Sequence, residues 1–205
     1  MSSLNYHRFG LLCVVSGPSG SGKTTLCHRL SREDRMADYA VSATTRAPRE
    51  GEVDGVDYFF QRREEFENHI ANRDFLEYAE VHGNLYGTLK SEVMNRLSQG
   101  HDVLVDIDVQ GAAQIREHRN EMIHDAMIDI FILPPDCEAL IERLRGRGTE
   151  SEEQLALRLA NAREEMKHWQ EYQYTIISDS KDADFATFSA IVNGERCRTS
   201  RLSEK

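Results

Sequence analysis

The chain has 205 residues and a formal net charge of −10, with 25 lysines and arginines against 35 aspartates and glutamates. This length predicts one compact unit, and the acidic balance argues against sequence-independent nucleic-acid binding, which needs a basic surface. No apolar run approaches the roughly 20 residues that cross a bilayer. The spacing of the cysteines matches neither a disulfide framework nor a zinc site, and the N-terminus lacks the apolar stretch of a signal peptide. We therefore expect a cytoplasmic protein without membrane or nucleic-acid partners.

The first predicted element is a buried strand. Residues 11–15 form a short continuous apolar run, which favours a strand buried on both faces of a parallel sheet. A glycine-rich turn follows, and apolar residues then recur at helical spacing. The sequence therefore predicts a strand, a loop and a helix over residues 11–32.

The turn carries a motif for binding phosphate. Residues 17–24 read GPSGSGKT and match G-x-x-x-x-G-K-[ST] in the strand–loop–helix setting that this motif requires. Its glycines let several backbone N–H groups point at one centre, and the helix adds the positive end of its dipole. Lys23 brings charge to the terminal phosphates, and Thr24 offers a hydroxyl to Mg²⁺. The expected ATP-binding residues are Gly17, Pro18, Ser19, Gly20, Ser21, Gly22, Lys23, Thr24 and Thr25.

Residues 42–90 differ from this pattern, since they are polar and punctuated by glycine. We interpret them as a small inserted subdomain with an aromatic strand candidate at 57–60 and a single helix near 62–72.

The buried-strand pattern then returns at residues 103–107 and 128–133, with a weaker version at 174–178. Helical patterns lie between them, one closing at Gly100 and another over 140–144. Strands that alternate with helices predict an α/β fold with a mainly parallel sheet.

Two carboxylates, Asp106 and Asp108, lie at the end of the strand predicted at residues 103–107. In proteins with this phosphate loop, an acidic residue at a neighbouring strand end commonly holds Mg²⁺. Alternatively, either residue caps the following helix or orients an arginine. We expect Asp106 to join Thr24 at the metal, although the sequence does not divide the roles between the two aspartates.

The C-terminal third begins with residues 145–153, which are too charged and glycine-broken for a core and predict a mobile surface segment. Residues 151–154 form a capping box that starts a long helix running toward Tyr172. Its apolar stripe, interpreted as core packing, is Leu155, Leu159, Ala162, Met166 and Trp169. We expect the last residues to be frayed.

The insert carries the motifs SATTRAPR at 42–49, Gly51-Glu52, Gly55, Asp57-Tyr58, Phe75-Leu76-Glu77 and Tyr86-Gly87-Thr88. Residues 106–111, Pro134-Pro135 and residues 147–150 follow them along the chain. Together and in this order, these motifs resemble those of guanylate kinases, and the match extends from about residue 10 to 190.

The resemblance implies a P-loop kinase core whose parallel β-sheet is flanked by helices, with an inserted GMP-binding subdomain and a lid. A guanylate kinase-like domain would then span residues 10–190. Its parts would be a core of 10–41, 91–142 and 159–190, an insert of 42–90 and a lid of 143–158, followed by a C-terminal tail of 191–205.

The resemblance also implies the residues that bind GMP. The guanidinium forks of two arginines suit a phosphate dianion. Glu77 matches the carboxylate that reads guanine, because N1–H and the exocyclic amine can donate to it together, whereas adenine presents an acceptor at N1. Such a site can reject the wrong base by roughly 10⁴-fold. The implied set is Ser42, Arg46, Arg49, Tyr58, Glu77, Tyr86, Thr88 and Asp108.

On the donor side, the resemblance implies that arginines of the lid and its base approach the ATP phosphates. The expected catalytic residues are Lys23, Arg143, Arg147 and Arg158. One departure is visible at Ser178, where many relatives carry asparagine, and it puts the adenine-side contact at that position in doubt.

These features predict an Mg²⁺-dependent ATP:GMP phosphotransferase of purine nucleotide metabolism, with dGMP as a second substrate. A kinase of a ribosyl bisphosphate is the first alternative, and the Ser42, Glu77 and Thr88 set argues against it. An inactive interaction module is the second, and the intact phosphate loop argues against that. The oligomeric state is not predicted.

Overall fold

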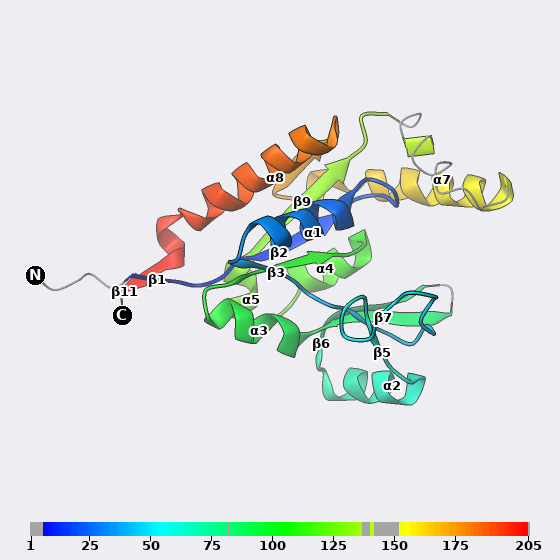
Figure 1. Ribbon diagram of the computed structural model, residues 1–205, viewed down its shortest axis with the longest axis horizontal. Helices are drawn as coiled ribbons and strands as arrows, with labels where there is room; N and C mark the ends of the chain where they lie inside the picture. The colour runs from blue at the N-terminus through cyan, green and yellow to red at the C-terminus, as the bar shows by residue number, and fades with distance from the viewer. Residues whose placement is uncertain (1–5, 82, 137–139, 142–151, 205) are drawn as a thin grey trace, which may run out of the picture.

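The computed structural model describes residues 6–81, 83–136, 140–141 and 152–204. Its centre is a sheet of five parallel strands in the order β10-β9-β2-β8-β3 (Figure 1). The predicted α/β class and parallel sheet are therefore confirmed. The strands are Leu12–Ser16 (β2), Ala37–Tyr39 (β3), Asp102–Asp106 (β8), Met127–Leu133 (β9) and Tyr174–Ile177 (β10).

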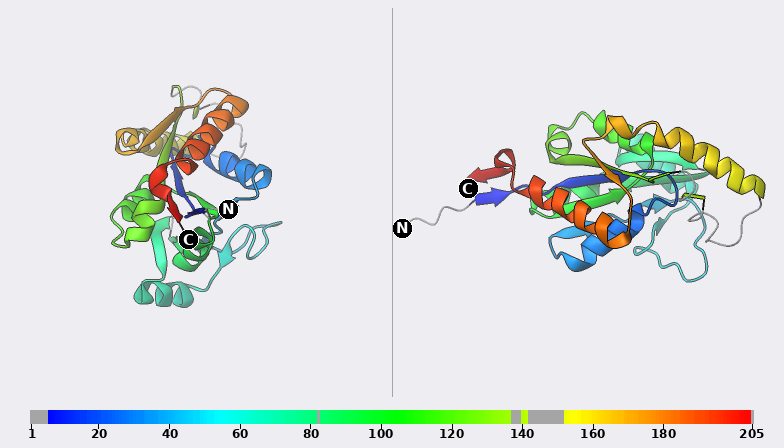
Figure 2. Two further views of the ribbon diagram at one scale, coloured as in Figure 1. Left: turned by 90° about the vertical axis from the view of Figure 1, so that its left-hand side faces the viewer. Right: turned by 90° about the horizontal axis from the view of Figure 1, so that it is seen from above.

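Both faces of this sheet are covered by helices (Figure 2). In β2, Leu12 and Val14 pack into one apolar cluster, while Cys13 and Val15 pack into another on the opposite face. Burial on both faces explains why the strands read as continuous apolar runs. One face carries α1 (Lys23–Glu33) and α8 (Lys181–Arg196), and the other carries α3 (Lys90–Ser98), α4 (Val109–Arg116) and α5 (Glu121–Ala126).

The insert forms a second sheet in the order β5-β4-β7-β6, with α2 packed against it. The helix expected near 62–72 is confirmed, and Phe66 on it stacks on Phe75 with ring centres 4.2 Å apart. The hairpin of β6 and β7 is an addition to the predicted elements. The insert contains β4 (Ala43–Thr44), β5 (Phe59–Phe60), α2 (Arg63–Asn72), β6 (Phe75–Val81) and β7 (Asn84–Leu89).

The predicted long helix is α7 (Glu152–Met166), followed by a 3₁₀ turn at Trp169–Glu171. Ala162 is buried, with Leu159 packed nearby, as expected for a core stripe. Trp169 is 40% exposed, so its prediction as core is wrong: the chain has left the α-helix before this residue and turns its indole outward. Of the segment predicted to be mobile, residues 145–151 lie outside the described residues.

The prediction that the last residues are frayed is also wrong for those that the structure describes. α8 continues to Arg196, and β11 (Leu202–Glu204) pairs antiparallel with β1 (Tyr6–Arg8). The cause is a fully buried carboxylate, Asp102, which binds Arg8 at 2.5 Å and Arg196 at 2.6 Å. A buried charge needs such partners, and here they come from both ends of the chain. No helix among the described residues is long and apolar enough to span a membrane.

Candidate active site

The phosphate loop joins β2 to α1, at the carboxyl end of the parallel sheet. Gly17, Gly20 and Gly22 have positive φ angles of 143°, 87° and 101°. At Gly17, a Cβ would lie 2.4 Å from the carbonyl oxygen of Ile132, so only glycine fits there. The first N–H groups of α1 lack intrahelical partners and are available to an anion.

Lys23 is folded back onto this loop. Its Nζ donates to the carbonyl of Gly17 at 2.6 Å and to that of Pro18 at 3.2 Å. Burial lowers the pKa of Lys23, while the carboxylates of Asp106 and Glu165 act in the opposite direction. A bound phosphate would give the buried ammonium a stronger partner than two neutral carbonyls.

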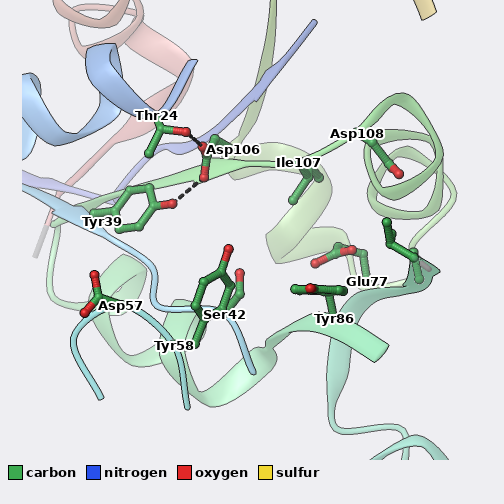
Figure 3. Close-up of a pocket in the computed structure, with 13 residues that line it drawn as sticks. Thr24, Tyr39, Ser42, Asp57, Tyr58, Glu77, Tyr86, Asp106, Ile107 and Asp108 are labelled. Carbon is green, nitrogen blue, oxygen red and sulfur yellow. Dashed lines mark hydrogen bonds between the residues drawn. The ribbon is translucent and has the colours of Figure 1, made fainter. Parts of the chain in front are cut away.

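The predicted metal-binding pair is brought together. Asp106, at the end of β8, accepts a hydrogen bond from the hydroxyl of Thr24 in the first turn of α1 (Figure 3). A second hydrogen bond reaches Asp106 from the phenol of Tyr39 on β3. A hydroxyl and a carboxylate are the hard oxygen donors that Mg²⁺ takes, and it commonly keeps waters on its other positions. The donor set therefore fits magnesium.

Asp108 has a different local role, because it is the N-cap of α4. Its Oδ1 accepts from the backbone N–H of Gly111 at 2.8 Å. The helix-capping alternative thus describes Asp108, while Asp106 faces Thr24. Both carboxylates line the cavity described next, so the cap does not remove Asp108 from the site.

A cavity of about 250 Å³ extends from the phosphate loop into the insert (Figure 3). Thr24 and Asp106 line one part of it, and Glu77 lines another. The structure thus brings residues from the core and the insert around one space. Of the residues predicted to bind GMP, those lining it are Ser42, Tyr58, Glu77, Tyr86 and Asp108.

Glu77 is only 6% exposed, on β6. Burial raises its pKa to about 7, although hydrogen bonds with Thr88 act in the opposite direction. Gly111 of α4 makes room for this carboxylate, because a Cβ there would lie 2.9 Å from its Oε2. The hydroxyls of Ser42 and Thr88 lie 3.5 Å apart, so the predicted base-reading residues are neighbours.

The two predicted phosphate-binding arginines lie beside this cavity and do not line it. Arg46 forms a bidentate pair with Glu52, with both N–O distances 2.9 Å, and its guanidinium lies 5.4 Å from the ring centre of Tyr58. Glu52 also accepts the backbone N–H of Arg49, whose side chain is exposed. Glu52 belongs to the Gly51-Glu52 motif, but nothing in the sequence indicated these contacts.

A second cavity, of about 780 Å³, lies along the N-terminal part of α1, and residues of the phosphate loop, Arg29 and Asp179 line it. Ser178 is 2% exposed, and its hydroxyl donates to Asp184 at 2.7 Å. The unusual serine therefore serves the start of α8, and the neighbouring Asp179 is the residue that reaches the cavity.

From α7, Arg158 donates to the hydroxyl of Ser19 at 2.7 Å, which places this predicted arginine on the phosphate loop. Glu165, two turns further along, bonds to the backbone of Ser19 and faces Lys23. These contacts of Glu165 were not predicted from the sequence, and only its place on the predicted helix could have suggested them. Arg143 and Arg147 lie outside the described residues.

Comparison with known proteins gives consistent results. A family profile described as "Guanylate kinase" matches residues 10–194. The guanylate kinase of Clostridium tetani is 45% identical over 195 residues, 95% of this chain and 91% of that protein. The guanylate kinase of Cereibacter sphaeroides is 46% identical over 194 residues, 95% of this chain and 90% of that protein.

Solved structures agree with these sequence matches. The crystal structure of guanylate kinase from Anaplasma phagocytophilum has a TM-score of 0.77 and 32% identity, covering 97% of this chain and 92% of that one. The SH3-kinase fragment of tight junction protein 3 has a TM-score of 0.50 and 13% identity, covering 98% of this chain and 64% of that one. The second likeness concerns the fold alone.

Proposed function

This chain belongs to the guanylate kinase family, and from that premise we propose how its residues transfer the terminal phosphoryl group of ATP to GMP, giving ADP and GDP. Residues 42–90 act as the GMP-binding insert and residues 143–158 as the lid, on a core that holds ATP. One observation carries the proposal: the base reader, Glu77, and the metal-binding pair, Thr24 and Asp106, line the same cavity.

Glu77 reads the base of the acceptor. Its carboxylate can accept from N1–H and from the exocyclic amine of guanine, with Ser42 and Thr88 beside it. Two donors stabilise the charged form, so GMP binding lowers the raised pKa of Glu77 toward its ordinary range. A sugar bisphosphate has no such paired donors and would add nothing to the hydrogen bonds that this buried carboxylate already has with Thr88, which argues against the ribosyl bisphosphate alternative. dGMP presents the same base and is a second acceptor.

The acceptor phosphate is held by Arg46 and Arg49, with the phenols of Tyr58 and Tyr86 nearby. Glu52 keeps the fork of Arg46 in place through its bidentate contact. Two guanidinium groups and two hydroxyls match the charge and the oxygen count of a phosphate. The nucleophilic phosphate oxygen is thereby aimed toward the phosphate loop.

The donor is held by the phosphate loop, with Lys23 and Arg158 placing positive charge near the transferring group. Phosphoryl transfer depends mainly on alignment and on such charge stabilisation. Thr24 and Asp106 hold Mg²⁺, which neutralises phosphate charge when bound. Arg143 and Arg147 complete the positive surround from the lid.

The site calls for small-molecule partners, and the net charge of −10 supports these over nucleic acid. Cys13 and Cys27 are free and buried, and Cys197 is free and exposed. Free thiols support a reducing compartment, and we propose the cytoplasm.

The direct test is ADP release from Mg-ATP measured with GMP, dGMP, AMP, CMP, UMP and ribose 1,5-bisphosphate as acceptors. We expect GMP and dGMP to be used and AMP to be rejected. Glu77→Gln should lower kcat/KM for GMP by roughly 10²-fold or more without changing the Kd of ATP, because the amide offers one acceptor in place of two. Glu64→Gln, on the exposed face of α2, is the matched control. An unchanged preference for GMP over AMP in Glu77→Gln would contradict the proposal.

A further inference from the structure

The carboxylate of Asp106 has two hydroxyl partners in the structure, and they differ in kind. Thr24 donates to Oδ2 from the phosphate loop. Tyr39 donates to Oδ1 from β3, a strand outside both the loop and the insert (Figure 3). Thr24 is itself a proposed metal ligand, so a bound Mg²⁺ would draw its hydroxyl away from Asp106. Tyr39 has no competing partner of that kind.

The sheet register explains how Tyr39 reaches this carboxylate. β3 runs parallel to β8 at the edge of the sheet, with Tyr39 opposite Leu104. Side chains two residues apart lie on one face of a strand, so Leu104 and Asp106 share a face. The phenol of Tyr39 extends along that face, from beside Leu104 to the strand end. Its ring is held against His28 of α1, with ring centres 4.2 Å apart.

We propose that Tyr39 is a positioning residue for magnesium, which holds the carboxylate of Asp106 in the orientation that binds the ion. The inference rests on the proposed metal role of Asp106. A hydrogen bond to Oδ1 restricts the rotation of the carboxylate about its Cβ–Cγ bond and keeps Oδ2 directed at Thr24, the other proposed metal ligand. Ligand groups fixed in this way by a second layer of contacts bind their metal more tightly.

The surroundings of Tyr39 favour a lasting contact with Asp106. Tyr39 packs against the apolar cluster on the α1 face of the sheet, and it also lines the acceptor cavity, the space of about 250 Å³ that Glu77 and Asp106 line. Without the phenol, Oδ1 would face that cavity with no fixed donor, and the carboxylate could turn away from Thr24. The hydrogen bond is present with and without the ion, so only part of the strength of a bond to a charged group appears in the metal affinity, and we expect roughly a threefold to tenfold change.

The test compares the Kd of ATP with Mg²⁺ and with EDTA, by calorimetry on the full chain without acceptor. The ratio of the two values is the magnesium-dependent gain. We expect Tyr39→Phe to lower this gain threefold to tenfold and to leave the Kd in EDTA within twofold of wild type. The variant keeps the ring contact with His28, and thermal unfolding checks its fold. Asp106→Asn should lose most of the gain.

Tyr174→Phe is the matched control, because it also removes a phenol from a carboxylate, that of Glu195, at a distant position. It should keep the full gain. A normal gain in Tyr39→Phe, when Asp106→Asn has lost it, would overturn the role of Tyr39 and leave the proposed function intact. A normal gain in Asp106→Asn would overturn the metal role itself, and the inference with it. Equal weakening of ATP in Mg²⁺ and in EDTA by Tyr39→Phe would show a structural effect and also overturn the inference.

Discussion

The phosphate loop and the acceptor cavity are built in different ways. The loop takes its groups from one contiguous stretch, residues 17–25, whose shape is set by glycine conformations and by the start of α1. Apart from Thr24, the cavity takes its groups from β3, β6, β7, β8, the turn before α4 and nearby parts of the insert, which lie far apart in the sequence. The shape of the loop therefore depends on its own backbone conformation, and the shape of the cavity depends on the contacts that hold the insert against the core.

Such contacts are visible between α4 and β6. The side-chain amide of Gln114 accepts from the backbone N–H of Tyr78 at 3.1 Å and donates to its carbonyl at 2.8 Å. Tyr78 is adjacent to Glu77, so the base reader is fixed where the insert meets the core. Changes in the loop other than at Thr24 should then affect the donor alone, and changes near α4 should affect the acceptor alone.

The largest expected effect is on the loop side. Lys23→Ala should lower turnover by about 10³-fold or more, because it removes the one cation that the loop itself supplies to the transferring group. The Kd of GMP should stay within about threefold of wild type, since the acceptor cavity is built elsewhere. ADP release and calorimetry measure the two quantities. Turnover close to wild type would contradict a catalytic role for Lys23 and the loop.

The same contrast separates what the sequence predicted from what it missed. The loop was predicted residue by residue because its motif is contiguous. In the insert, the resemblance supplied Glu77 and its neighbours, but Tyr39 had no signal, and Gly111 belonged to the motif at residues 106–111 without being given a role. Their roles arise from the pairing of β3 with β8 and from the packing of α4 on β6, which no local pattern encodes. The ordered C-terminus was missed for the same reason, because its buried partner is Asp102.

A second prediction concerns the cost of the buried base reader. The pKa of Glu77 is about 7 in the folded chain against an ordinary 4.5, so the folded state binds its proton more tightly than the unfolded state. Stability from this group is present below pH 4.5 and is lost as pH rises toward 7. The unfolding free energy of Glu77→Gln relative to wild type should therefore increase over this window, by about 3 kcal/mol.

Urea unfolding at several pH values measures this difference. Groups with lowered pKa values, such as Asp34 and Glu195, lose stability as pH falls, but they are common to both chains and cancel. Glu64→Gln, which is exposed, should show a flat difference. Saturating GMP should shrink the effect for Glu77, because its donors stabilise the charged carboxylate. A flat difference for Glu77→Gln would mean that this carboxylate carries no burial cost.

The smallest effect is expected where the core supports the insert without touching the substrate. A Cβ on Gly111 would lie 2.9 Å from Oε2 of Glu77, so Gly111→Ala should displace the carboxylate and raise the KM for GMP roughly fivefold to tenfold, with the KM for ATP unchanged. Gly194→Ala, in α8, meets no atom within 4 Å and should leave both constants unchanged while stabilising the helix by about 0.5 to 1 kcal/mol. Equal changes in both KM values for Gly111→Ala would indicate that the two sides of the site are not independent, because a contact confined to the base reader cannot weaken ATP.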